Sequence, residues 1–223
     1  MSPRAIADAA AQQGLDLIAI TDHNTASMTD VVAEAAAERG IRFLHGVEVQ
    51  TREEVHVLAY FDRSEACQAF AEEIYRLLPD RPNDPRAFGD QPIVDLDENI
   101  LRFEPRLLLN SVDLSFEDTV ERILEHEGLA VPAHIDRSVF GLIEQLGFLP
   151  EGMSFPLVEV VGDVMPMGFD RGARLCSSDA HDLDQIGRRS TEFVMEAVSL
   201  KEIRRAAAGI DGRSVVCRNQ KRR

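Results

Sequence analysis

Residues 15–24 read LDLIAITDHN, an apolar run that stops abruptly at four polar residues. A run of this length with such a boundary predicts a buried strand. Thr21, Asp22, His23 and Asn24 would then follow the end of that strand, and each has a side chain that can bind a cation or form a hydrogen bond. Functional groups at strand ends are typical of (β/α) barrels, so this stretch predicts a barrel enzyme.

Histidines and carboxylates recur at four further apolar runs that lie far apart in the sequence. They are His45 and Glu48 in residues 41–49, His56 in 54–60, His134 and Asp136 after 129–133, and Asp179 and His181 after 173–176. Such ligands suit zinc, manganese or iron, whereas an all-oxygen set would indicate calcium or magnesium. We therefore expect a metallohydrolase. His45 is left out of the expected site, and His126 is expected to be a solvated residue at a helix end.

The composition agrees with one cytoplasmic enzyme domain that acts on a small anionic substrate. The 223 residues suit a single α/β barrel, and no signal peptide or long apolar stretch is found. The net charge of −15 repels nucleic-acid phosphates, so a long nucleic acid is an unlikely partner and a membrane is not expected. Cys67, Cys176 and Cys217 are odd in number and far apart, which predicts neither a disulfide framework nor a zinc ribbon.

Strand and helix patterns alternate along the chain, which predicts an α/β fold with parallel strand pairing. The expected strands are residues 15–20, 41–49, 54–60, 129–134, 156–161, 173–177 and 191–195. The expected helices are a first one between Ser2 and Gly14, then residues 28–39, 64–78, 115–127, 138–146 and 200–208. Ser115 is placed to cap the fourth of these helices.

Two segments interrupt the alternation. Residues 79–110 contain five prolines and few periodic apolar positions, which predicts an insertion near the rim of the active site. Residues 218–223 form a short basic tail that is expected to be disordered. Residues 1–217 are expected to form a single domain.

Four motifs resemble those of the polymerase and histidinol phosphatase (PHP) phosphoesterase domains. They are Thr21-Asp22-His23-Asn24, Gly46-Val47-Glu48 with His56 eight residues later, Pro132-Ala133-His134, and Ser178-Asp179-Ala180-His181. The resemblance extends over nearly the whole chain. It implies a distorted (β/α)7-type barrel that holds two or three divalent ions, of manganese, zinc or iron. It also implies hydrolysis of a small phosphomonoester, a nucleotide or a short oligonucleotide.

The resemblance also implies roles for individual residues. Glu48 would bridge two ions, one of them completed by His56 and His134, and Asp179 would help to hold the other. A third ion would be held by His23 and His181. The expected reaction is the attack of a metal-bound hydroxide on phosphorus. We assign catalytic roles to Asp22 and His181, and expect Asp22 and Asp136 to orient the histidine ligands. Arg137 would clamp the phosphate, or else pair with a surface carboxylate such as Glu144.

The sequence departs from the family pattern at its beginning. These domains normally open with a strand that ends in His-x-His, and no such pair precedes Ser2. The expected barrel therefore lacks its first strand, and the edge of residues 15–20 would be unpaired. Either Met1 is an internal methionine with the motif encoded upstream, or the protein is a natural remnant with weakened metal binding. We favour the first explanation.

The sequence is also compatible with two other functions. A catalytically impaired or non-catalytic PHP-like module would bind a metal or ligand for structural or regulatory purposes. A hydrolase of C–N bonds related to the amidohydrolases would use similar ligands. Those enzymes often carry a carboxylated lysine, whereas Lys201 and Lys221 are the only lysines here and neither follows an expected ligand strand. The second alternative is therefore the weaker one.

Overall fold

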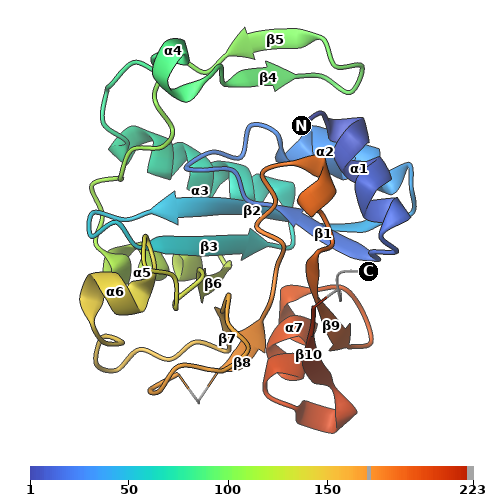
Figure 1. The fold of residues 1–223 in the computed structure, drawn as a ribbon, viewed down its shortest axis with the longest axis vertical. Coiled ribbons are helices and arrows are strands. Elements are labelled where there is room, and N and C mark those ends of the chain that lie inside the picture. Colours follow the sequence, from blue (N-terminus) through green and yellow to red (C-terminus); the bar gives the residue numbers. More distant parts are fainter. Residues whose placement is uncertain (170–171, 220–223) are drawn as a thin grey trace.

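A central mixed sheet organises the fold. The computed structural model describes residues 1–169 and 172–219. Its sheet has the strand order β1 (Leu17–Ile20), β2 (Arg42–Gln50), β3 (His56–Phe61) and β6 (Leu129–Pro132), as Figure 1 shows. β1 runs parallel to β2, whereas β3 is antiparallel to both β2 and β6. The expectation that the strands pair in parallel is therefore wrong for β3.

The short connection between β2 and β3 explains this direction. The Thr51 N–H donates to the Val55 carbonyl oxygen at 2.9 Å, which closes a tight turn. A parallel return would need a crossover of a dozen or more residues, so a turn of this length forces β3 back along β2. Alternating sequence patterns indicate strands but do not reveal the direction of a strand after so short a turn.

Three pairs of strands accompany the central sheet. β7 (Leu157–Glu159) and β8 (Ala173–Leu175) pair in parallel, and the other two pairs are antiparallel. These are β4 (Pro92–Val94) with β5 (Ile100–Phe103), and β9 (Arg189–Val194) with β10 (Ser214–Asn219). Across residues 1–169 and 172–219 the strands thus form one mixed sheet and three small pairs, and a closed barrel is not observed.

The helices follow the predicted pattern closely. The longer ones are α1 (Pro3–Gln12), α2 (Thr29–Ala37), α3 (Ser64–Leu77), α5 (Phe116–Glu125) and α7 (Leu200–Ala207). The shorter ones are α4 (Pro85–Phe88), α6 (Leu142–Leu146), and the 3₁₀ turns η1 (Leu183–Gln185) and η2 (Ile210–Gly212). Ser115 caps α5 as predicted, because its Oγ accepts the Asp118 N–H at 3.0 Å. α6 is shorter than predicted because the chain turns at Phe140, whose φ is 61°.

The two faces of the sheet have different roles. Val47, Val49 and Phe61 belong to a buried cluster that includes residues of α3 and α5. Leu44 and Leu58 belong to a second cluster with residues of α7. Glu48 pairs in register with Leu58, and Gln50 pairs with His56. Because side chains alternate along a strand, Leu44, Glu48 and Gln50 share one face. Polar side chains therefore continue this apolar face at one end of the sheet.

The segment 79–110 contains α4 and the β4–β5 hairpin, which lies apart from the central sheet at the top of Figure 1. Its last residues return to the sheet. The buried Asn24 side chain donates to the carbonyl oxygens of Leu108 and Asn110 at 2.8 and 2.9 Å. Asn24 therefore anchors this segment beside the end of β1. No helix in the described part of the chain has the length and apolar character needed to span a bilayer.

The C-terminal hairpin corrects two predictions. Cys176 and Cys217 form a disulfide, although their separation of 41 residues gave no sign of it. Cys67 is buried and free. Cys217 lies on β10, a strand that the sequence patterns did not predict. Arg218 and Asn219 also belong to β10, so the expected disordered tail is wrong for these two residues. The remaining tail residues, 220–223, lie outside the described part of the chain.

Candidate metal centre

Four predicted ligands converge at one end of the central sheet. Glu48 lies near the end of β2, His56 is the first residue of β3, and His134 follows β6. His23 follows β1 and forms an isolated parallel bridge with Glu48. Parallel strands end at the same edge of a sheet, and an antiparallel neighbour begins there. The pairing of these strands therefore brings the four side chains together.

The distances between these side chains are short. Glu48 Oε1 lies 2.9 Å from His56 Nδ1 and 3.4 Å from His134 Nε2. Glu48 Oε2 lies 3.4 Å from His23 Nδ1. The two ring nitrogens His56 Nδ1 and His134 Nε2 are 3.2 Å apart. Three imidazole nitrogens thus surround one carboxylate, and Glu48, His56 and His134 are all buried.

This arrangement fits a divalent cation. The ligand atoms of His23, Glu48 and His56 lie within 4.8 Å of one another, and those of Glu48, His56 and His134 lie within 3.4 Å of one another. His23 Nδ1 is buried and forms no hydrogen bond within the described chain, although it faces the Glu48 carboxylate. Leaving a buried polar atom without a partner costs free energy, and a cation would supply that partner. Imidazole nitrogen and carboxylate oxygen are both common ligands of zinc in proteins.

The electrostatics of Glu48 agree with this interpretation. Burial raises the pKa of the Glu48 carboxyl, but hydrogen bonds with His134 and His56 outweigh it and hold the pKa well below its usual range. Glu48 is therefore an anion at neutral pH. Burial has the opposite effect on His23 and lowers the pKa of its imidazole, which favours the neutral form that binds metals.

The other two predicted ligands, Asp179 and His181, form contacts outside this cluster. The Asp179 carboxylate pairs with the Arg137 guanidinium at 2.5 Å, and the His181 ring is 69% exposed. Arg137 thus holds a carboxylate of the candidate site, rather than Glu144. Asp136 accepts hydrogen bonds from the backbone N–H groups of Val161 and Gly162 at 2.8 and 2.6 Å, so the expectation that it orients a histidine is wrong.

Comparison with known proteins identifies the family. A PHP domain model matches residues 1–129, which is more than half of the chain. The chain belongs to the PHP domain family. The match includes His23, Glu48 and His56 and ends before His134, Asp179 and His181. It confirms the resemblance inferred from the motifs. No curated protein sequence matched the chain.

Solved structures share the fold of this PHP domain. The lesion-specific endonuclease Q of Pyrococcus furiosus is 20% identical with a TM-score of 0.72, over 99% of this chain and 55% of the endonuclease. A two-domain Bacteroides vulgatus protein with a predicted PHP-like metal-dependent phosphoesterase is 17% identical with a TM-score of 0.57, over 97% of this chain and 60% of that protein. The chain thus spans somewhat more than half of each. At these identities the similarity shows the fold alone.

Several residues that contact the histidines of the cluster were not predicted from the sequence. The Glu159 carboxylate accepts hydrogen bonds from the His134 backbone N–H at 2.9 Å and from the Ser177 hydroxyl. The Phe140 ring stacks on His56 with centroids 4.5 Å apart and planes 6° from parallel. Gln50 forms a hydrogen bond with His56. Glu159 lies within a predicted strand, so its carboxylate could have been found by the reasoning that identified Glu48.

The half-buried Asp22 precedes His23 in the sequence. Burial raises the pKa of the Asp22 carboxyl to about 6. A carboxyl that remains protonated to a higher pH in the folded state makes the fold less stable as the pH rises. In the metal-free protein, we expect Asp22→Asn to gain roughly 3 kcal/mol of unfolding free energy relative to wild type between about pH 4 and pH 7. Urea unfolding at both pH values measures this change, and a pH-independent difference would contradict it.

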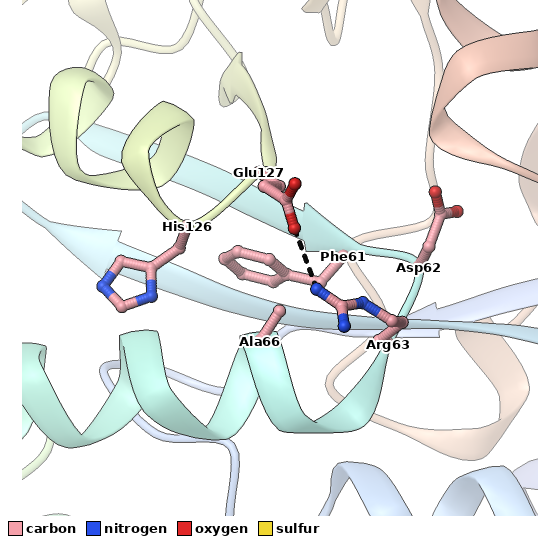
Figure 2. Close-up of a pocket in the computed structure, with 6 residues that line it drawn as sticks. All are labelled: Phe61, Asp62, Arg63, Ala66, His126 and Glu127. Atoms are coloured by element: carbon pink, nitrogen blue, oxygen red, sulfur yellow. Dashed lines mark hydrogen bonds and ion pairs between the residues drawn. The ribbon is translucent and has the colours of Figure 1, made fainter.

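Two surface hollows flank the sheet at opposite ends. One of about 190 Å³, drawn in Figure 2, is lined by Phe61, Asp62, Arg63, Ala66, His126 and Glu127 at the far end of β3. Its Arg63 and Glu127 side chains already pair at 2.8 Å. The other, of about 400 Å³, is lined by Gln50, Glu54, Pro79, Arg81, Leu109, Asn110 and Ser111. The second hollow is next to the candidate metal centre, because Gln50 contacts His56.

Proposed function

We propose that this PHP domain is a metal-dependent phosphoesterase that hydrolyses a small phosphomonoester, a nucleotide or a short oligonucleotide. The observation that carries the proposal is the meeting of three imidazoles around the buried Glu48 carboxylate, with His23 Nδ1 left without a hydrogen bond among residues 1–169 and 172–219. Leaving this buried ring nitrogen without a partner is costly unless a cation binds its lone pair. The fold that the chain shares with PHP-like phosphoesterases supports the same function.

The residues can be assigned roles in this reaction. His23, Glu48, His56 and His134 would hold the first ion, of manganese, zinc or iron. Asp179 and His181 would hold a second or third. A bound divalent ion supplies an acidified water as nucleophile and neutralises phosphoryl charge. Asp22, with its pKa raised to about 6, is suited to accept a proton at neutral pH. Arg137 would exchange Asp179 for the substrate phosphate, because a guanidinium binds either anion with two hydrogen bonds.

A longer nucleic acid also belongs among the substrates to be tested. One of the similar structures is endonuclease Q in complex with a 27-mer duplex that carries an abasic lesion at the active site. It is 20% identical over 96% of this chain and 53% of the endonuclease, with a TM-score of 0.70. The net charge of −15 opposes binding of a duplex. The similarity to endonuclease Q and the net charge therefore point in opposite directions, and a duplex with an abasic site is included among the substrates to be tested.

A non-catalytic metal-binding module is the second candidate function. The Arg137–Asp179 ion pair favours it, because this contact occupies a carboxylate that a complete site would need. The two functions differ in the number of ions that bind and in turnover. A catalytic site would bind two or more ions per chain, whereas the module would bind one ion and release no phosphate.

The deciding experiment is reconstitution with Mn²⁺ or Zn²⁺ followed by a substrate panel. The panel contains p-nitrophenyl phosphate, mononucleotides, short oligonucleotides and a duplex with an abasic site. We expect turnover of at least one of the first three, its loss in His56→Ala, and its retention in His45→Ala. His45 is a matched control because it lies on β2 outside the cluster, 3.4 Å from Asp30. A metal-loaded wild type that cleaves nothing in the panel would refute the proposed hydrolase.

A further inference from the structure

Gln50 connects the metal centre to the segment that follows the insertion. It lies two residues after Glu48 on β2 and pairs in register with His56. Its side-chain oxygen lies 3.2 Å from His56 Nε2, and its side-chain nitrogen donates to Ser111 Oγ at 2.9 Å. Both Gln50 and His56 are buried, with exposed fractions of 7% and 4%. Competition from water for these hydrogen bonds is therefore small.

The backbone around Gln50 is also fixed. Its N–H donates to Asn24 Oδ1 at 3.3 Å, and its carbonyl oxygen accepts the Val112 N–H at 2.9 Å. Asn24 in turn holds the segment through Leu108 and Asn110. Hydrogen bonds on both backbone atoms and on both ends of the amide leave the Gln50 side chain little freedom to rotate.

The contact with His56 determines which ring nitrogen can bind a metal. The Nδ1 atom faces Glu48 Oε1 at 2.9 Å and His134 Nε2 at 3.2 Å, so Nδ1 is the atom directed into the cluster. A neutral imidazole that coordinates through Nδ1 carries its proton on Nε2. The amide oxygen of Gln50 only accepts hydrogen bonds, so it stabilises this tautomer and no other.

We propose that Gln50 is a positioning residue that holds the His56 imidazole with Nδ1 directed at the metal and Nε2 protonated. This inference rests on the metal centre of the proposed function and adds to it a residue that touches neither ion nor substrate. Partners of this kind raise the basicity of a ligand histidine and fix its ring orientation. Phe140, which stacks on the same ring, restricts its tilt but offers no acceptor to Nε2.

The test compares three variants of the full chain. Gln50→Met keeps a side chain of similar length without a strong acceptor, and Gln50→Glu keeps an acceptor. Ser111→Ala leaves the Gln50 oxygen in place and removes only the partner of its nitrogen. Zn²⁺ affinity is measured by competition with a chromogenic chelator, and the Co²⁺ absorption spectrum reports the ligand geometry. Circular dichroism of each variant confirms that it is folded.

We expect Gln50→Met to bind Zn²⁺ about 10- to 100-fold more weakly than wild type, with an altered Co²⁺ spectrum. Gln50→Glu should restore binding to within a few-fold of wild type, and Ser111→Ala should bind with an affinity between wild type and Gln50→Met. If Gln50 had a purely structural role, Zn²⁺ affinity would not be restored in Gln50→Glu while it is lost in Gln50→Met. Equal Zn²⁺ affinity in wild type and Gln50→Met would overturn the inference.

Nitrogen-15 NMR of histidine-labelled, Zn²⁺-loaded wild type provides a second readout. We expect the His56 signals of a ring that is protonated at Nε2 and coordinated at Nδ1, and the reverse assignment would overturn the inference. Hydrolysis is scored separately. Zn²⁺ binding that depends on Gln50 without turnover of any substrate would refute the hydrolase and leave the role of Gln50 intact. A wild type that binds no metal would refute both.

Discussion

Glu48→Gln is expected to abolish tight metal binding and, with it, phosphoester hydrolysis. The substitution keeps the size of the side chain and removes the negative charge that contacts all three imidazoles of the cluster. Loss of an outer partner of a ligand typically costs about 10- to 100-fold in metal affinity, so loss of this central ligand should cost at least about 100-fold. Isothermal titration with Zn²⁺ and Mn²⁺ measures the effect, and phosphate release from the active substrate measures its consequence.

The control for this variant is Glu34→Gln, which makes the same change in charge at an exposed position of α2. It should bind metal and turn over substrate as wild type does. If Glu48→Gln retained wild-type affinity for both ions, the cluster around Glu48 would not be the metal centre, and the role assigned to it here would be wrong.

Cys217→Ser is expected to lower the unfolding free energy of the oxidised protein by about 2 to 4 kcal/mol. The Cys176–Cys217 disulfide closes a loop of 41 residues and ties β10 to the end of β8. A cross-link of this span restricts the unfolded chain, which is the main source of its stabilising effect in the chain-entropy account. Denaturation in guanidinium chloride without reductant measures the loss.

Reduction supplies the matched control for the disulfide. Dithiothreitol should lower the stability of wild type to about that of Cys217→Ser and leave the variant unchanged. Cys67 is buried and free, so reductant has no bond to break there. Wild type that is equally stable with and without reductant would show that the disulfide does not form in solution or does not stabilise the fold.

The sequence predicted the position of the candidate site better than the topology of the sheet. His23 and His134 follow apolar runs that became β1 and β6, and Glu48 and His56 lie within the predicted strands. These residues meet because β1, β2 and β6 end at the edge of the sheet where the antiparallel β3 begins, so the direction of β3 is needed to bring His56 there. The direction itself depends on the turn at Thr51, whose hydrogen bonding is invisible in a pattern of apolar residues.

The remaining features depend on contacts between distant residues, which patterns along the chain do not report. Cys176 and Cys217 meet only because β10 pairs with β9 beside β8, and β10 was not predicted. The pairing of Arg137 with Asp179 joins residues on separate loops. Gln50 was within reach of sequence reasoning, because residues two apart on a strand share a face and Glu48 was already a candidate ligand.

Anomalous X-ray diffraction from crystals soaked in Zn²⁺ or Mn²⁺ shows whether a cation binds at the Glu48 cluster, because it locates the ion without reference to any activity. We expect an anomalous peak within coordination distance of Glu48, His56 and His134, about 2.0 to 2.2 Å for nitrogen and oxygen ligands of zinc. We also expect the His23 Nδ1 atom to turn toward that peak. Peaks confined to surface residues, with the Glu48 cluster empty at saturating metal, would show that this cluster is not a metal centre.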